Sequence, residues 1–290
     1  MKKENENERI ASTSWLAENL GNPLMRIVEV SDMKDPQLYF GGHIPGAVYW
    51  PWKESLWDGT IREFVFPKAF SELMEKSGIG HETTVVFYSN SLQFASYASW
   101  VCTMRGHNNW MILNGNRSLW VKENRPFTDE IPRLQPGHYP IRTSDESSRI
   151  GREGVLAGLN NPDRVLLDLR SPEEFYGERV IPQHFPVDHG AERKGHIPGA
   201  KHLFYSELLH EDETFKPLER LREAFYKRGA TPDKEIVFYC RLSHRGTCGW
   251  FVARFLLGYS RTKVYDGSWT EWGSIVGFPI VNESLANKRA

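Results

Sequence analysis

The sequence has only three cysteines, almost balanced charge and no uninterrupted apolar run of membrane-spanning length. An odd number of cysteines without a framework spacing does not suit a disulfide-stabilised scaffold, whereas a reactive thiol suits a reducing compartment. The formal net charge is −1, so we expect no overall attraction to nucleic acid or to an anionic membrane. The charged N-terminus, residues 1–9, lacks the apolar core of a signal peptide. We therefore expect a cytoplasmic protein without a nucleic-acid or membrane partner.

Sequence signatures of nucleotide and metal binding are also missing. Neither G-x-x-x-x-G-K-[ST] nor H-E-x-x-H occurs in the chain. The segment 177–194 contains His, Asp, Glu and Arg side chains, but it has no cysteine and no recognisable ligand spacing. A solvated loop that frames a substrate is therefore favoured over a metal site in this segment. We expect no metal and no organic cofactor.

What the sequence does contain is an internal repeat. The 290 residues suggest two domains of ordinary size, and the same landmarks recur in the same order in both halves. The repeated pairs are residues 43–47 and 196–200, 85–88 and 236–239, and 112–115 and 264–267. We predict a first domain at residues 1–131, a Pro-, Ser- and charge-rich linker at 132–148 and a second domain at 149–290. Alternating short strands and helices in each half predict an α/β fold, with a mainly parallel sheet covered by helices on both faces.

One stretch of the second half concentrates reactive chemistry. Residues 235–239 have the length and composition of a buried strand, and residues 247–257 are apolar enough for a partly buried helix. Cys240 lies between them, at the carboxyl end of the strand, where open α/β sheets bind their ligands. Loop amides, the start of the helix, Arg241 and Arg245 all favour a thiolate. We predict that Cys240 is a nucleophile at neutral pH.

The simpler interpretation of each cysteine is a small buried hydrophobic side chain. Cys102 and Cys248 fall inside apolar helical stretches, and for them we adopt this interpretation. Cys240 differs because it ends a strand, is flanked by basic residues and opens a polar loop. These three features together favour a functional thiol.

Four ordered motifs resemble those of the rhodanese sulfurtransferases, over essentially the whole chain after the first ten or so residues. They are Leu167–Phe175 (LDLRSPEEF), His196–Ala200 (HIPGA), the Cys240–Arg245 loop after its apolar strand, and Asp266–Trp272 (DGSWTEW). The resemblance implies tandem rhodanese-like domains of the thiosulfate or 3-mercaptopyruvate sulfurtransferase type. It also implies that sulfur is carried as a persulfide.

The resemblance suggests how the site works. Cys240 attacks the outer sulfur of thiosulfate, while Arg170 and Arg241 hold the leaving sulfite through charge-assisted hydrogen bonds. Loop amides and Arg245 stabilise the persulfide that remains. A thiophilic acceptor, cyanide or a cellular thiol, then removes the sulfur.

Further residues are expected to support this chemistry. Ser243 and His244 belong to the same loop, and His244 either tunes the thiolate or is merely exposed. Arg179 is a further candidate for substrate contact. Asp168 is expected to orient the arginine two residues later, or the loop, and not to transfer protons. Trp269 is expected near the mouth of the site by family analogy, with core packing as the alternative.

The first half lacks this set of residues. Ser89 stands where the second half has the cysteine, and Asn90 stands where it has the following arginine. Glu29 and Ser31 replace the aspartate and the arginine of the DxR motif, and the loop is one residue shorter. No base that would activate a serine is evident in the sequence. We predict a catalytically inactive first domain.

Loop length distinguishes the chemistries that remain open. Cysteine phosphatases use Cys-x5-Arg, one residue longer than the Cys-x4-Arg found here, which resembles the sulfur-transferring members of the family. A loop that starts with Cys-Arg resembles thiosulfate enzymes, so thiosulfate is the expected donor and 3-mercaptopyruvate the alternative. A persulfide-carrier module with a protein acceptor and a phosphatase remain as further hypotheses.

Overall fold

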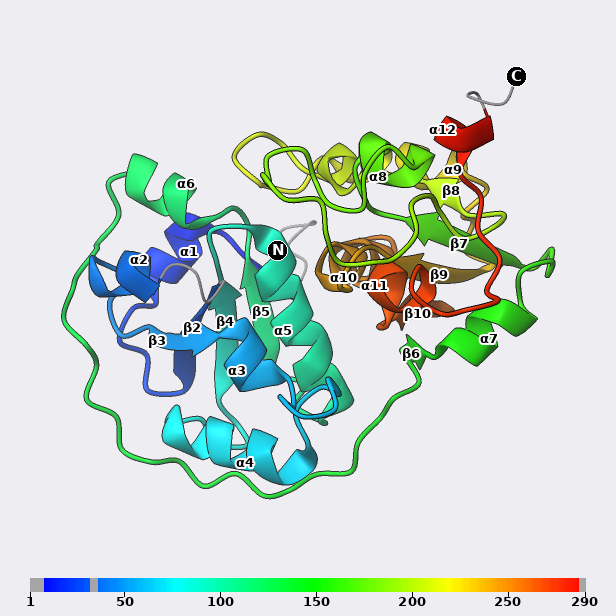
Figure 1. The fold of residues 1–290 in the computed structure, drawn as a ribbon. Helices are drawn as coiled ribbons and strands as arrows, with labels where there is room; N and C mark the ends of the chain where they lie inside the picture. Colours follow the sequence, from blue (N-terminus) through cyan, green and yellow to red (C-terminus); the bar gives the residue numbers. More distant parts are fainter. Residues whose placement is uncertain (1–7, 32–35, 287–290) are drawn as a thin grey trace. The chain divides into compact units, whose positions relative to one another are not determined.

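The structure, a computed structural model, describes residues 8–31 and 36–286 (Figure 1). The predictions that fall on residues 1–7, including the missing signal peptide, lie outside the described residues. Two compact units are present. One runs to Glu146 and includes Glu211–Phe215, and the other comprises Ser147–His210 and the chain from Lys216 onward. Among the described residues, no helix has the length and apolarity needed to cross a bilayer.

The first unit is built on a parallel sheet with the strand order β1-β5-β4-β2-β3. Its strands are β1 (Ile10–Ala11), β2 (Met25–Ser31), β3 (Val48–Pro51), β4 (Thr84–Tyr88) and β5 (Trp110–Leu113). Its helices are α1 (Thr13–Glu18), α2 (Pro36–Phe40), α3 (Trp52–Leu56), α4 (Pro67–Lys76), α5 (Leu92–Met104) and α6 (Arg117–Lys122). The central strands are nearly continuous apolar runs, as expected for a parallel sheet buried on both faces.

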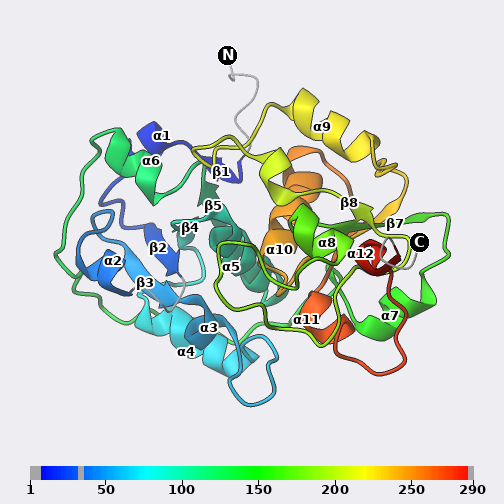
Figure 2. The ribbon, with the colours of Figure 1, turned by 45° about the horizontal axis from the view of Figure 1, so that its top comes forward.

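The second unit repeats this plan with the order β6-β10-β9-β7-β8, again all parallel (Figure 1). Its strands are β6 (Arg149–Ile150), β7 (Arg164–Asp168), β8 (Lys201–His202), β9 (Glu235–Tyr239) and β10 (Thr262–Tyr265). Its helices, labelled in Figure 2, are α7 (Arg152–Ala157), α8 (Pro172–Tyr176), α9 (Leu218–Tyr226), α10 (His244–Phe251), α11 (Ser268–Trp272) and α12 (Glu283–Ala286), with a 3-10 turn at Tyr205–Leu208. The equivalent strand order of the two sheets confirms the tandem α/β architecture.

Helices cover both faces of the second sheet. Because successive strand residues point to opposite faces, Val237 and Tyr239 of β9 face one layer and Phe238 faces the other. The first layer packs residues of α7, α8 and α11, namely Val155, Phe175, Trp269 and Trp272. On the opposite face, the ring of Phe225 in α9 lies 6.0 Å from the ring of Phe238. Burying a side chain such as Phe238 stabilises the fold by roughly 1.5–3 kcal/mol relative to exposing it.

The HIPGA turns are held in the same way in both units. The backbone N–H of His43 donates to Thr128 at 2.7 Å, and that of His196 donates to Val281 at 2.8 Å. In each histidine, Nδ1 lies 2.9 Å from a backbone oxygen, that of Tyr39 in the first unit and that of Phe175 in the second. Because the contacts are also present in the first half, which has no equivalent of Cys240, these histidines stabilise the turn.

The helix after the loop differs in detail from the one expected at residues 247–257. It begins at His244, three residues earlier, and its last turn, Val252–Leu256, is π-helical. The wider turn carries the Leu257 N–H to the carbonyl of Val252 at 2.9 Å. Cys248 is fully buried in α10, as Cys102 is in α5, which confirms that both are core side chains.

Most of the predicted linker belongs to the first unit, which extends to Glu146. Residues 132–146 have no regular secondary structure. Tyr139 is nevertheless buried, and its carbonyl accepts a hydrogen bond from Ser71 Oγ at 2.6 Å. The backbone N–H of Asp145 likewise donates to the carbonyl of Met104 at 2.8 Å. The segment is thus an extended strap on that unit.

Candidate active site

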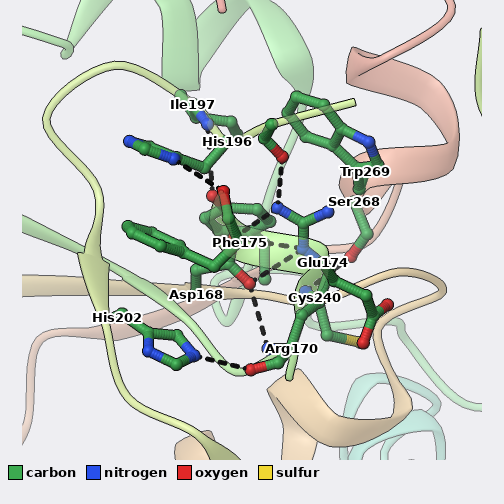
Figure 3. A network of polar contacts seen from close by, with 12 residues as sticks. Asp168, Arg170, Glu174, Phe175, His196, Ile197, His202, Cys240, Ser268 and Trp269 are labelled. Atoms are coloured by element: carbon green, nitrogen blue, oxygen red, sulfur yellow. Dashed lines mark hydrogen bonds and ion pairs between the residues drawn. The ribbon is translucent and has the colours of Figure 1, made fainter. Parts of the chain in front are cut away.

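Cys240 directly follows β9 at the carboxyl edge of the second sheet (Figure 3). Its backbone N–H donates to Ser268 Oγ at 3.2 Å, and its carbonyl accepts from Trp269 N–H at 2.9 Å. Both bonds tie the cysteine to the start of α11. The residue is only 1% exposed, so it is shielded from solvent.

Two serines with positive φ angles shape the loop without any glycine between Cys240 and α10. Ser243 has φ 70° and Ser268 has φ 53°, a conformation that costs a non-glycine residue of order 1 kcal/mol or more. Hydrogen bonds offset this strain, because Ser243 Oγ donates to Asp266 at 2.9 Å and Ser268 Oγ donates to Tyr265 O at 2.9 Å. Ser268 Oγ also accepts the Ser243 N–H at 3.1 Å. The hydroxyl of Ser243, a residue expected to support the chemistry of the loop, thus donates to Asp266.

Arg245 is bound to a carboxylate that the sequence patterns above did not single out. Its two terminal nitrogens donate to Glu174 at 2.6 and 2.9 Å, and Ser171 N–H donates to the same carboxylate at 3.0 Å. Burial alone would raise the pKa of Glu174, but Arg245, together with Arg170 and the Ser171 N–H, outweighs it and holds that pKa below its usual range. Glu174 thus engages both terminal nitrogens of Arg245. The S-x-x-E pattern at residues 171–174, typical of a capping box, is the sequence signal that could have identified Glu174.

Arg170 lies inside the fold of the second unit. Its side chain is fully buried, and its Nη2 donates to Asp168 Oδ2 at 2.6 Å and to Gly195 O at 2.7 Å (Figure 3). Its guanidinium carbon lies 4.5 Å from the ring centre of Trp269. Burial disfavours its charge, but Asp168 outweighs burial and raises the pKa of Arg170. Asp168 therefore binds and orients the enclosed Arg170 guanidinium, whose Nη1 has no hydrogen-bond partner among the described residues. Trp269 packs in the core.

Two further expected residues take structural positions. His244 is 5% exposed and opens α10, so it is not the exposed side chain considered as one alternative. Arg179 donates to the carbonyls of Phe185 at 2.9 Å and Gln183 at 3.3 Å, so it stabilises the 177–194 segment from within. Among the described residues, no group of three or more His, Cys, Asp or Glu side chains is arranged to hold a metal.

Arg241, which directly follows the cysteine, also retains unused donors. Its Nη2 lies 3.4 Å from the carbonyl oxygen of His189, at the outer limit of a hydrogen bond. Its Nε is buried, and the described part of the chain offers it no hydrogen-bond partner. Burial lowers the pKa of Arg241, while the nearby charges of Glu174 and Cys240 oppose that shift. A cation that is partly buried and only weakly paired is suited to bind an anion.

The first unit keeps a buried acid–base pair but builds it from different residues. Glu29 replaces the aspartate, and its Oε1 lies 3.9 Å from Arg117 Nε. Arg117 stands at the place of Trp269 in the repeat, while Ser31 stands at the place of the buried arginine. Burial raises the pKa of Glu29. Ser89 itself is 1% exposed.

Comparison with known proteins places the chain in a family. Residues 12–123 and 152–275 match the model of the rhodanese-like domain. The sulfur carrier protein TtuD of Thermus thermophilus is 43% identical over 277 residues, which cover 94% of this chain and 96% of that protein. A protein of Saccharopolyspora erythraea named "Putative thiosulfate sulfurtransferase" is 40% identical over 276 residues, 95% of this chain and 96% of its own length.

Solved structures share the fold. Wild-type EanB superposes with a TM-score of 0.81 at 23% identity, covering 95% of this chain and 69% of that one. YnjE gives a TM-score of 0.78 at 22% identity, covering 95% and 68%. The repeated domain match and the full-length relatives show that the chain belongs to the two-domain rhodanese family of sulfurtransferases.

Proposed function

We propose that the protein transfers the sulfane sulfur of thiosulfate to a thiophilic acceptor through a persulfide on Cys240. The observation that carries the proposal is the placement of this thiol. It ends the central strand β9 of the second unit, its loop is fixed to α11, and the weakly paired Arg241 follows it. The name of the Saccharopolyspora relative agrees with this donor.

In the first half-reaction, the Cys240 thiolate attacks the outer sulfur of thiosulfate. A new S–S bond forms on the cysteine, the S–S bond of thiosulfate breaks, and sulfite leaves with the electron pair. The cysteine then carries a persulfide anion. Arg241 is the cation that binds the oxyanion end of the donor and of the leaving sulfite.

In the second half-reaction, the acceptor attacks the outer sulfur of the persulfide. Cyanide leaves as thiocyanate, or a thiolate leaves as a new persulfide, and the Cys240 thiolate is regenerated. No external oxidant or reductant enters the cycle. In this scheme Arg245 and Arg170 are positioning residues, since Glu174 and Asp168 bind their guanidinium groups.

A persulfide carrier that delivers sulfur to a protein is the second candidate, because a relative of 43% identity is named a sulfur carrier. The 1% exposure of Cys240 suits a sulfur that is shielded from water until a partner protein presents its thiol. The two candidates differ in turnover. An enzyme for small acceptors releases thiocyanate continuously, whereas a dedicated carrier takes up one sulfur and discharges it slowly to cyanide.

A mercaptopyruvate enzyme and a phosphatase would each behave differently from a thiosulfate enzyme. A mercaptopyruvate enzyme would load Cys240 faster from 3-mercaptopyruvate than from thiosulfate. A phosphatase would need the loop arginine for its phosphate, but Arg245 is bound by a buried glutamate.

The test is steady-state thiocyanate formation from each sulfur donor with cyanide. We expect turnover with thiosulfate in the parent protein, none in Cys240→Ala, and parental turnover in Cys248→Ala, the matched variant of a buried cysteine in the same unit. Turnover that survives in Cys240→Ala would refute the proposal. Persulfide loading without turnover would select the carrier.

A further inference from the structure

The second unit contains a segment, Gly177–Lys194, that makes the connection from α8 to the HIPGA turn longer than in the first unit. Among its residues the structure shows no regular helix or strand. The segment is nevertheless fixed internally. Asp188 accepts the Val180 N–H at 2.8 Å and contacts Lys194 Nζ at 3.0 Å. It is therefore an ordered segment and not a loose loop, and we refer to residues 177–194 as the wall.

Arg193 anchors the end of this wall beside the catalytic loop. Its guanidinium donates to four backbone carbonyls at 2.6–3.0 Å, those of Trp272, Gly273, Ile275 and Phe278. Its own carbonyl accepts the Trp269 indole N–H at 3.0 Å. Trp269 in turn donates its backbone N–H to Cys240. The wall and the cysteine loop thus share α11 as a common support.

The wall meets the loop where Arg241 rests on it. The nearest point is Gly190, which has φ 113°, a conformation that favours glycine. A Cβ atom placed on Gly190 would lie 2.5 Å from Arg241 Nη2 and 2.8 Å from Nε. The guanidinium is the far end of a flexible side chain, so an added methyl group would displace Arg241 sooner than the backbone. The missing side chain at residue 190 therefore makes the space that the guanidinium occupies.

We propose that Gly190 is a specificity-determining residue, because it lets Arg241 rest beside Cys240 with donors available for the oxyanion group of the sulfur donor. The proposal rests on the proposed function and extends it. The substrate class is a small donor whose transferable sulfur sits next to a sulfonate or carboxylate group. The carbonyl of His189 supplies only a long contact of 3.4 Å to Nη2, and Nε has no partner in the described part of the chain. The substrate oxyanion completes the hydrogen bonding of Arg241.

The test compares Gly190→Ala with Gly258→Ala. Gly258 also has a positive φ, 75°, but nothing lies within 4 Å of the place of its Cβ atom, so this control carries backbone strain without the collision. Loss of a hydrogen bond to a charged group corresponds to about a 10- to 100-fold effect. We expect KM for thiosulfate to rise by about that factor in Gly190→Ala, with kcat changed much less, and to stay near the parental value in Gly258→Ala. Parallel assays with 3-mercaptopyruvate show which oxyanion depends more on Arg241.

A double-mutant cycle shows whether Gly190 acts through Arg241. If it does, Gly190→Ala adds little further loss when Arg241 is already alanine. An undiminished loss in the Arg241→Ala background would overturn the proposal. So would a KM of Gly190→Ala within about twofold of the parental value.

A second readout does not depend on sulfur transfer. Alkylation of Cys240 by anionic iodoacetate is compared with alkylation by neutral iodoacetamide, and peptide mass identifies the modified cysteine. We expect the rate with iodoacetate divided by the rate with iodoacetamide to fall about tenfold or more in Gly190→Ala and in Arg241→Ala, but not in Gly258→Ala. An unchanged ratio in Gly190→Ala overturns the proposal. If the parent protein transfers no sulfur but the ratio still falls in Gly190→Ala and Arg241→Ala, the anion site is upheld and the proposed function is refuted.

Discussion

At the scale of single residues, the second unit depends on charges that are buried in pairs. Arg245 with Glu174 and Arg170 with Asp168 are nearly or fully enclosed. Removing one partner of such a pair leaves an uncompensated buried charge, which costs far more than the pair contributes. The arginines nearest the thiol in sequence are therefore not equivalent. Arg241 is weakly paired, whereas Arg245 is fully engaged.

The Glu174–Arg245 pair gives a prediction about stability. Glu174→Gln should destabilise the second unit by about 3–5 kcal/mol, because the Arg245 charge loses its counterion inside the fold. Urea unfolding measures the effect, and Glu173→Gln is the control, since that neighbouring side chain is partly exposed. A loss below about 1 kcal/mol in Glu174→Gln would mean that Arg245 has an alternative partner.

A buried histidine gives a prediction about pH. His107 is fully buried in the first unit, and burial lowers its pKa from the ordinary 6.5 to about 4. The unfolded chain therefore binds the extra proton between these values, so stability is lost as pH falls from about 6.5 to 4. At about 1.36 kcal/mol per pKa unit, the loss from this group approaches about 3 kcal/mol.

Thermal melts between about pH 7 and 4.5 test this prediction. His107→Gln should lose less stability on acidification than the parent, whereas His138→Gln, whose side chain is 91% exposed, should follow the parent. Equal acid sensitivity of the parent and His107→Gln would show that His107 is not the responsible group.

At the scale of elements, Ser268 joins the end of β9 to the starts of α10 and α11. Its hydroxyl accepts the N–H groups of Cys240 and Ser243 and donates to Tyr265 O. Unsatisfied buried donors cost about 1–3 kcal/mol each. Ser268→Ala should therefore destabilise the second unit by a few kcal/mol and slow persulfide formation on Cys240.

The matched control is Ser274→Ala, whose exposed hydroxyl donates to the carbonyl of Thr270. It should keep both the midpoint of unfolding and the rate of sulfur loading. If Ser268→Ala also loads sulfur at the parental rate, Ser268 does not hold the loop in its reactive shape.

The sequence predicted the elements well where local pattern decides them. The strand at 235–239 is found with those bounds, because an apolar run flanked by polar residues specifies a buried strand. The contacts that shape the site were not predictable from local pattern. Glu174 and Arg245 are 71 residues apart, and Gly190 meets Arg241 only after two segments without regular structure fold together. The complete burial of Arg170 was not predictable either, because a motif gives the residue type but not the direction of its side chain.

At the scale of the whole molecule, two units share one topology, and only the second has a cysteine directly after its central strand. We infer that the first unit is inactive for more reasons than the loss of a thiol. Asn90 replaces the weakly paired arginine, and the loop is one residue shorter. The buried acid is paired by Arg117 in the first unit, so the residues around the loop have also diverged.

This divergence predicts that a cysteine alone does not restore function. The double variant Ser89→Cys, Cys240→Ala should form no thiocyanate from thiosulfate and cyanide above the level of Cys240→Ala. A measurable rate in the double variant would show that the shorter loop of the first unit can still bind the donor.

Cys240, as the carrier of the transferred sulfur, is the residue on which the proposed function depends. Its role is measured by peptide mass analysis of the reduced protein after brief exposure to thiosulfate, with a neutral alkylating agent added to trap persulfides. We predict one added sulfur atom on the peptide that contains Cys240, none on the peptides that contain Cys102 or Cys248, and loss of the added sulfur when cyanide is supplied. Sulfur found on another cysteine, or no sulfur on Cys240 while thiocyanate is being formed, would contradict this role.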